Sequence, residues 1–151
     1  MNKVIFLFVT LFGIGKLKKI PGSYASLATT IFLFLLFHIL NIKPNIILIA
    51  VIIIFFISLH AVNIFIKDLD NKDPKEVVID EFIGQSLPIC LYEIAHENVK
   101  ETSEVLTFYF IIFVLFRIFD IVKPYPVSYY DKNFKNSFGV IMDDVCAGLY
   151  V

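Results

Sequence analysis

The sequence has few of the residues on which metal-binding, redox and nucleic-acid-binding proteins depend. Its two cysteines, Cys90 and Cys146, lie far apart in apolar surroundings, which excludes a CxxC pair and predicts two small packing residues. Its three histidines are isolated, which argues against zinc; His38 and His60 are expected to pack within apolar runs, and His96 to lie in a loop. The net charge is −1 and no basic run is long, so nucleic acid is excluded as a partner.

Tryptophan is absent, so tyrosine must supply any aromatic anchors at a membrane surface. Polar residues are also scarce, because 58% of the 151 residues are hydrophobic and 17 are phenylalanine. The mean hydropathy is +0.82. A soluble domain of this size cannot bury so much apolar surface. We therefore expect residues 1–151 to form a single integral membrane domain.

The apolar residues fall into four hydrophobic segments, at about 26–40, 45–66, 77–92 and 105–122. The third is the weakest, because it begins with two acids and contains Pro88, which should kink a helix. Residues 4–14 are too short to cross a bilayer and lack a cleavage site, so they are expected to form a retained interfacial or re-entrant segment. A further helix should begin near Val140. The predicted fold class is all-α, an integral membrane helical bundle.

Basic residues alternate between the polar connections. Ten of them lie in three regions and only two, Lys43 and Lys100, lie in the connections between those regions. The positive-inside rule therefore places the three rich regions on the cytoplasmic side. Four glutamates, at positions 93, 97, 101 and 104, are expected to lie on a solvated connection on the opposite side of the membrane. The basic residues of the rich regions are Lys16, Lys18, Lys19, Lys67, Lys72, Lys75, Arg117, Lys123, Lys132 and Lys135.

The stretch FRIFDIVKPYP places three charges at the end of an apolar helix. Arg117, Asp120 and Lys123 are spaced by three, so they lie along one side of that helix. They could be snorkelling or structural charges, but charges at this depth usually face a bundle interior and mark function. Pro124 and Pro126 should end the helix and impose an extended exit.

Two pairs of adjacent acids interrupt other apolar runs. Asp80 and Glu81 lie in VVIDEFIGQ, and Asp143 and Asp144 lie in GVIMDDVCAG. Acids at a helix N-terminus can simply be favoured by the helix dipole. Adjacent acids point in different directions, so one could bind a metal while the other serves as a base. Carboxylates without histidine or cysteine favour Mg²⁺, and Gly84 permits close helix approach.

The stretch GIGKLKKIPGSYASL resembles a phosphate loop only in part. A Walker A motif needs Ser or Thr after the lysine, whereas Leu17 follows Lys16. What remains is a basic loop leading into a helix start at Pro21, where free N–H groups can receive an anion. The lysines could also be plain cytoplasmic anchors. Anion-binding lysines, a buried arginine and two carboxylate pairs together favour phosphoryl transfer on a lipid at the membrane edge.

Four stretches, IPGSYASL, VVIDEFIGQSL, FRIFDIVKPYPV and FGVIMDDVCAG, resemble the phosphatidylglycerophosphatase A family in sequence and order. The resemblance implies a bacterial inner-membrane, multi-pass, Mg²⁺-dependent phosphatase whose active site faces the cytoplasm. Such enzymes remove the terminal phosphate of phosphatidylglycerophosphate to leave phosphatidylglycerol. The membrane phospholipid would be the partner, and the oligomeric state stays open. The family usually continues past DDxxAG with another apolar helix, whereas seven residues follow Asp144 here, which predicts a shortened last span or a truncated chain.

The resemblance also implies roles for individual residues. Mg²⁺ would be held by some or all of Asp80, Glu81, Asp143 and Asp144, and a metal-bound water is expected to attack the phosphate. Asp120 would be a further ligand or the group that orients Arg117. The residues expected to bind substrate are Lys18, Lys19, Gly22, Ser23, Arg117 and Lys123; Pro21, Gly22 and Ser26 fall on the family's first loop.

Two other readings remain. Intramembrane charges are equally typical of a transporter or an ion-binding membrane protein. A transporter, however, tends to have internal repeats or polar groups near mid-membrane, whereas the charges here gather at one edge. The third reading is a phosphatase for another lipid, such as phosphatidic acid.

Overall fold

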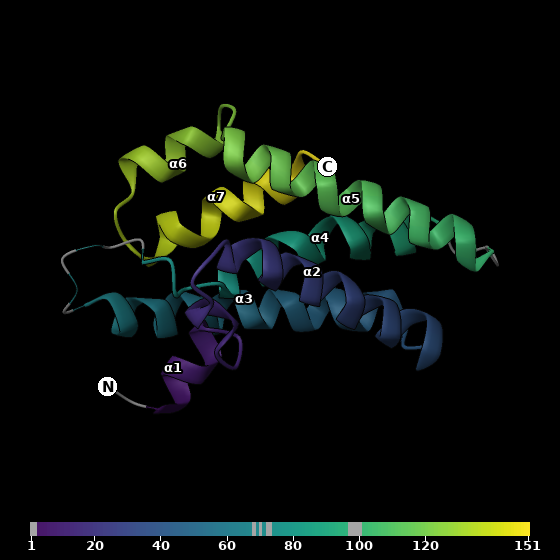
Figure 1. Cartoon of the computed structure of the whole chain (residues 1–151), viewed down its shortest axis with the longest axis horizontal. Coiled ribbons are helices and arrows are strands. Elements are labelled where there is room, and N and C mark those ends of the chain that lie inside the picture. The colour runs from purple at the N-terminus through teal and green to yellow at the C-terminus, as the bar shows by residue number, and fades with distance from the viewer. Residues whose placement is uncertain (1–2, 68, 70, 72–73, 97–100) are drawn as a thin grey trace.

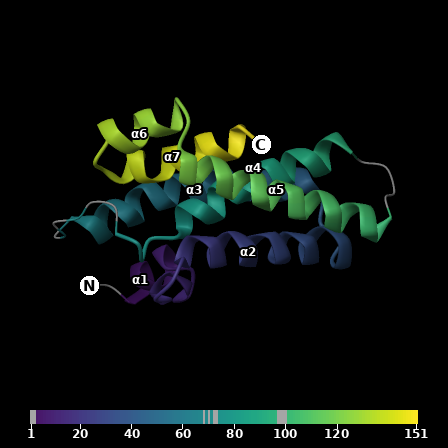
Figure 2. The ribbon, with the colours of Figure 1, turned by 45° about the horizontal axis from the view of Figure 1, so that its top comes forward.

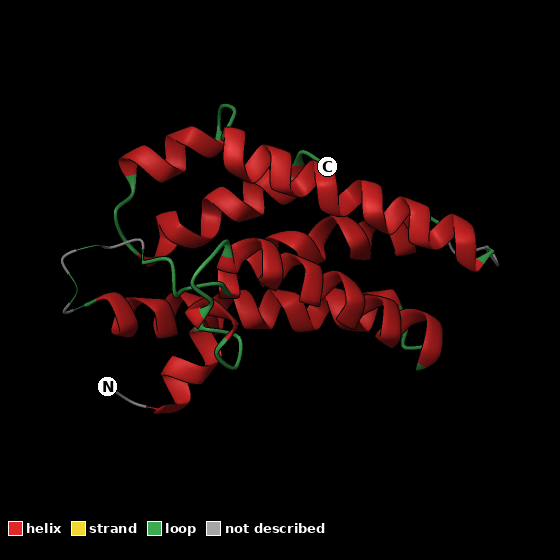
Figure 3. Cartoon of the chain, viewed as in Figure 1, coloured by secondary structure: helices red, strands yellow, loops and turns green. Residues whose placement is uncertain are grey.

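The computed structural model describes residues 3–67, 69, 71, 74–96 and 101–151. Throughout this part of the chain the fold is all-helical, as predicted, and contains no strand (Figure 3). A short 3₁₀ turn at Ile14–Lys16 precedes α2, and α2 continues into a π-helical turn at Leu35–Ile39. The helices are α1 (Lys3–Val9), α2 (Pro21–Phe34), α3 (Pro44–Ile66), α4 (Ile79–Ala95), α5 (Thr102–Val122), α6 (Val127–Asn133) and α7 (Ser137–Leu149).

Among the described residues, three helical stretches are long and apolar enough to cross a membrane. They are Pro21–Ile39, Pro44–Ile66 and Thr102–Val122, and they correspond to the first, second and fourth apolar segments of the sequence. The third segment forms α4, which has only 17 residues and contains Pro88. This helix is buried among α2, α3 and α7. Protein, rather than lipid, therefore surrounds the helix that carries Asp80, Glu81 and Glu93.

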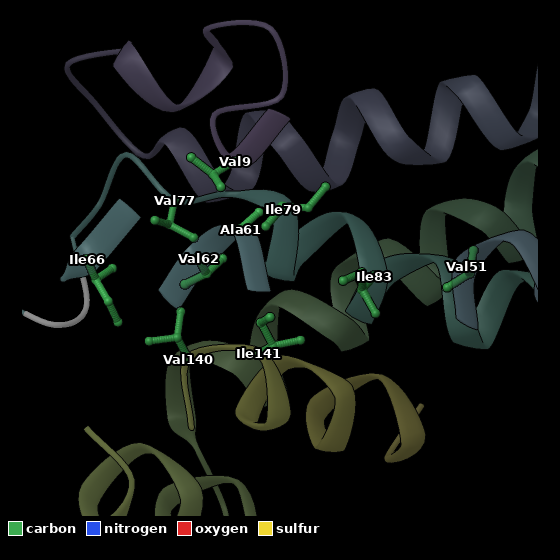
Figure 4. Close-up of a cluster of buried hydrophobic side chains, with 10 residues drawn as sticks. All are labelled: Val9, Val51, Ala61, Val62, Ile66, Val77, Ile79, Ile83, Val140 and Ile141. Carbon is green, nitrogen blue, oxygen red and sulfur yellow. The ribbon is translucent and has the colours of Figure 1, made fainter. Parts of the chain in front are cut away.

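The core is divided along the length of the bundle. One cluster of buried side chains joins α1, α3, α4 and α7, and includes Val9, Val62, Ile83 and Ile141 (Figure 4). A second cluster joins α2, α4 and α5 nearer the opposite end, around Leu33, Ile89, Val105 and Tyr109. Both clusters contain residues of α4, so this helix fixes the positions of its neighbours at both ends.

The helix ends that carry the predicted site lie together. The first turns of α2, α4 and α7 and the last turn of α5 are at one end of the bundle, near α1 and α6 (Figure 1). The turn between α2 and α3 and the start of α5 are at the other end. The basic regions of the sequence therefore share one end. Lys72, Lys100 and Glu97, which entered the topology prediction, lie outside the described residues.

Three local predictions differ from the structure. The chain does not leave α5 in an extended form, because it turns at Pro124–Pro126 and starts α6, whose sequence VSYYDKN has no apolar periodicity. The last helix begins at Ser137 rather than near Val140, and the Asn136 side chain caps it by accepting from the Gly139 N–H at 3.0 Å. His60 is exposed on α3 rather than packed. Cys90 and Cys146 are free and buried, as predicted.

The N-terminal segment forms only the two-turn helix α1, which is too short to span. It is tied to the bundle where the Val78 N–H donates to the Val9 carbonyl at 3.0 Å. Val9 itself is fully buried. This contact fixes the backbone just before the acidic pair of α4.

Candidate active site

A polar cleft of about 490 Å³ opens at the end of the bundle where α2, α4, α5 and α7 meet. Nearly all the residues predicted from the sequence line it. Lys19 does not, because its side chain is directed to solvent on the loop before α2. The sequence analysis did not identify Asn71 and Lys75, which reach the cleft from the connection between α3 and α4. The predicted residues that line the cleft are Lys18, Gly22, Ser23, Asp80, Glu81, Arg117, Asp120, Lys123, Asp143 and Asp144.

Three carboxylates meet on one side of the cleft. Asp80 and Glu81 are in the first turn of α4, and Asp144 is in α7; one oxygen of each lies within 4.8 Å of the others. Asp144 is only 3% exposed. Among the described residues, Glu81 Oε2 and Asp144 Oδ2 are buried without a hydrogen-bond partner. Buried like charges repel strongly unless a cation compensates them, so this trio has the chemistry of a divalent-cation site.

Two glycines make the trio possible. Gly84 of α4 faces Asp144 of α7, and a Cβ at position 84 would lie 2.6 Å from the Asp144 carbonyl oxygen. A Cβ at Gly148 would collide with the Gly84 carbonyl. The two backbones therefore touch, which the absence of side chains permits. This close approach places Asp144 beside the first turn of α4.

Arg117 connects the trio to α2 and α5. Its Nη1 donates to Asp120 Oδ2 at 2.8 Å and to Ser26 Oγ at 3.3 Å, and lies 4.0 Å from Glu81 Oε1. The Arg117 Nε–H is buried and has no acceptor among the described residues. Gly22 leaves room for the Glu81 carboxylate, with which any side chain at that position would collide. The guanidinium thus keeps a donor for a ligand in the cleft.

Asp143 lies outside the trio and pairs with Lys123. The Lys123 Nζ donates to Asp143 Oδ2 at 2.6 Å and to Asp131 Oδ1 at 2.7 Å. Burial lowers the pKa of Lys123, but its hydrogen bonds to Asp131 and Asp143 outweigh that effect and leave the pKa above its ordinary value. Burial likewise raises the pKa of Asp131, and the hydrogen bond from Lys123 brings it below the ordinary value. Asp131 was not identified from the sequence, where it resembles an ordinary surface acid.

The sequence pattern of the family described as Phosphatidylglycerophosphatase A matches residues 7–151. The chain belongs to the phosphatidylglycerophosphatase A family. It is accordingly a phosphatase, a hydrolase of phosphate esters.

Relatives in several bacteria resemble this phosphatase over most of their length. A phosphatidylglycerophosphatase A of Haemophilus influenzae is 33% identical over 97% of this chain and 83% of its own. That of Escherichia coli K12 is 28% identical over 91% of this chain and 73% of its own. A Bacteroides thetaiotaomicron protein named "Putative phosphatidylinositol-3-phosphatase" is 33% identical over 92% of this chain and 83% of its own. No solved structure matches the chain.

The phosphatase also has a second polar cluster, near the other end of the bundle. Glu93 was predicted on a solvated connection, but it belongs to α4 and is only 8% exposed. Its Oε1 accepts from the Tyr109 hydroxyl at 3.0 Å and lies 3.2 Å from His38 Nε2. The sequence signal was present, because Glu93 follows Leu91 and Tyr92 and precedes Ile94 in an apolar run. Glu101 and Glu104 are exposed, as predicted.

Proposed function

We propose that this phosphatase hydrolyses the terminal phosphomonoester of phosphatidylglycerophosphate to phosphatidylglycerol and inorganic phosphate. The reaction would take place at the cytoplasmic face of the bacterial inner membrane, with the membrane phospholipid as the partner. The family membership and the names of the Haemophilus and Escherichia relatives support this substrate. The position of the cleft at the basic-rich end of three apolar helices supports this orientation. The single observation that carries the proposal is the carboxylate trio facing Arg117 across one cleft.

We propose Mg²⁺ as the cofactor, held by Asp80, Glu81 and Asp144. The trio supplies only oxygen ligands, and the unpartnered oxygens of Glu81 and Asp144 fit an ion of this kind. When bound, the ion would act as a Lewis acid that neutralises charge on the phosphate oxygens. Asp143 remains engaged by Lys123 and would support the neighbouring Asp144 rather than ligate directly.

The chain's own groups can hold the phosphate during the reaction. Arg117 offers its Nε–H, and Asp120 fixes the direction of the guanidinium through the 2.8 Å ion pair. Lys123 adds positive charge to the cleft that Arg117 lines, and Lys18 also lines this cleft, together with Gly22 and Ser23. The N–H groups of the first turn of α2 can receive phosphate oxygens. The trio also provides carboxylates to accept the proton of an attacking water.

A second substrate is favoured by one observation. The Bacteroides relative is as similar in identity as the Haemophilus one, and its name indicates a phosphoinositide. Both lipids carry a phosphomonoester on a membrane-anchored headgroup. The two proposals therefore share the cleft chemistry and differ only in the alcohol that leaves.

The proposal is tested by measuring phosphate release from a panel of lipids. Purified protein in detergent should release phosphate from phosphatidylglycerophosphate faster than from phosphatidylinositol 3-phosphate or phosphatidic acid, and EDTA should stop the reaction. Asp80→Asn and Asp144→Asn should each lower the rate about a hundredfold or more, because each removes a charged ligand from the trio. Glu101→Gln, at an exposed position at the far end, is the matched control and should keep the wild-type rate.

The outcomes separate the alternatives. Faster phosphate release from phosphatidylinositol 3-phosphate or phosphatidic acid would mean that the proposed substrate is wrong, while the proposed site would still stand. Equal rates for Asp80→Asn, Asp144→Asn and Glu101→Gln would rule out the trio as the reaction centre. Release from none of the lipids would favour a transporter or ion-binding protein.

A further inference from the structure

An apolar groove of about 350 Å³ runs between α2 and α5, on the part of the bundle that would lie in the membrane. The two helices contact one another and run side by side in both ribbon views (Figure 1; Figure 2). The side chains that define the groove are Leu27, Ile31 and Phe34 of α2 and Leu106, Phe110 and Phe113 of α5.

The groove and the polar cleft lie on the same faces of these two helices. Along α2, Ser23 of the cleft is followed at four-residue steps by Leu27 and Ile31 of the groove. Along α5, Arg117 of the cleft is preceded four residues earlier by Phe113 of the groove. Residues at this spacing share one side of a helix. Cleft and groove are therefore consecutive stretches of one seam, polar at its mouth and apolar further in.

Where the cleft meets the groove, the hydroxyls of Ser26 and Thr30 already have hydrogen-bond partners within the protein. Ser26 Oγ accepts from Arg117 and donates to the Gly22 carbonyl at 3.0 Å, and Thr30 Oγ1 donates to the Ser26 carbonyl at 2.9 Å. Hydroxyls that are hydrogen-bonded to a carbonyl of their own helix need no hydrogen-bond partner from a ligand. Beyond Arg117 the seam thus presents hydrocarbon to its occupant.

Two aromatic rings line the far end of the groove, and one of them belongs to the second polar cluster. Phe34 meets Tyr109 edge-on with ring centroids 6.0 Å apart, and Tyr109 is held by its hydrogen bond to Glu93. Tyr109 is also almost fully buried. From Leu27 to Phe34 the groove is about 10 Å long, at roughly 1.5 Å per helical residue. Its length and its end are therefore both defined by ordered side chains.

We infer that this groove holds one fatty acyl chain of the same lipid molecule whose phosphate occupies the cleft. The inference rests on the proposed function, because it adds a chain-binding subsite to that phosphatase site. An amphiphile with an anionic phosphate at one end and hydrocarbon at the other matches the polarity of the seam along its length. Bulk lipid would cover the same surface but has no phosphomonoester to fix it beside Arg117.

Tryptophan fluorescence can detect this occupant directly, because the chain has no tryptophan of its own. Phe110→Trp places a reporter at the rim of the groove, and Phe56→Trp places one on α3. The two positions are matched, since Phe110 is 66% exposed and Phe56 is 64% exposed. The probe is a lipid phosphonate with brominated acyl chains, which resists hydrolysis and quenches tryptophan on contact. Brominated phosphatidylcholine at the same mole fraction represents bulk lipid.

The brominated phosphonate should quench the Phe110→Trp reporter several-fold more strongly than brominated phosphatidylcholine does. Adding excess unbrominated phosphonate should abolish this extra quenching, because it competes for the groove. The Phe56→Trp reporter should respond equally to both lipids. If both reporters respond alike, the groove holds only bulk lipid and the inference is wrong. This comparison does not depend on turnover.

A kinetic comparison separates failure of the groove from failure of the proposed function. Ile31→Trp narrows the groove, whereas Ile53→Trp alters an equally exposed site on α3 (53% and 54% exposed). Ile31→Trp should lower kcat/KM for a long-chain substrate about tenfold, the effect of roughly two buried methylene groups, and spare a dihexanoyl substrate. Equal losses for both chain lengths, or for both variants, would contradict the groove. Absence of wild-type phosphate release would instead contradict the proposed function.

Discussion

At the scale of single residues, Arg117 links three parts of the cleft. Its guanidinium contacts Asp120 one turn further along α5, Ser26 on α2 and, at 4.0 Å, Glu81 on α4. All three contacts are made by Nη1, which leaves the Nε–H of the planar fork without a partner among the described residues. A side chain with a single nitrogen cannot reproduce this arrangement. Its position, rather than its charge alone, is what the site depends on.

Arg117→Lys should therefore lower kcat/KM about a hundredfold although the charge is kept, because a single ammonium nitrogen lacks the second, separately directed donor of the planar guanidinium. Steady-state phosphate release measures this effect. Ser26→Ala is the comparison: it removes the 3.3 Å contact with Arg117 and a hydrogen bond within α2, and should cost a few-fold at most. Near-wild-type activity of Arg117→Lys would show that a point charge suffices.

At the scale of elements, α4 is the helix that organises the site. It carries Asp80 and Glu81 at one end and Glu93 at the other, and it is buried among its neighbours. Its closest partner is α7, against which it packs through Gly84 and Gly148. The distance between these two backbones determines whether Asp144 reaches the other two acids.

Gly84→Ala should separate α4 from α7, because the new Cβ would lie 2.6 Å from the Asp144 carbonyl oxygen. We expect a loss of stability of about 1–3 kcal/mol, as for overpacked cores, and a larger loss of phosphate release, since Asp144 would leave the trio. Thermal unfolding in detergent and the phosphate assay measure the two effects. Leu149→Ala, at an exposed position of α7, should change neither. Full activity of Gly84→Ala would mean that the trio tolerates a wider helix spacing.

At the scale of the whole molecule, the two ends of the bundle differ in chemistry. The cleft end holds charged residues of α4, α5 and α7 and of the loops before α2 and α4, whereas the other end has a compact cluster around Glu93. Three apolar helices connect the ends. This asymmetry predicts a preferred orientation in a membrane.

Cysteine labelling tests that orientation. Cys90 and Cys146 are buried, so they should contribute little background to an impermeant maleimide. Asn133→Cys, exposed at the cleft end, should react only after spheroplasts are permeabilised, whereas Ser103→Cys, exposed at the other end, should react in intact spheroplasts. Full labelling of both in detergent confirms access. The reverse pattern in intact spheroplasts would place the cleft outside the cell.

The sequence by itself determined the all-helical class, the three helices that are long and apolar enough to cross a membrane, the end of α5 and nearly every charged residue that lines the cleft. These features follow from local chemistry. Apolar runs of sufficient length must form helices in lipid, because every backbone group must be hydrogen-bonded there. Charged residues inside such runs, such as Asp80 and Arg117, are costly and therefore stand out.

Only the tertiary structure decided which charges meet. Asp143 and Asp144 are neighbours in sequence, yet one pairs with Lys123 and the other joins Asp80 and Glu81. The role of Asp131 and the apolar seam between α2 and α5 were likewise invisible in the sequence. The physical reason is that a side chain's partner depends on helix rotation and spacing. Contacts between distant segments, such as that of Gly84 with Gly148, set both.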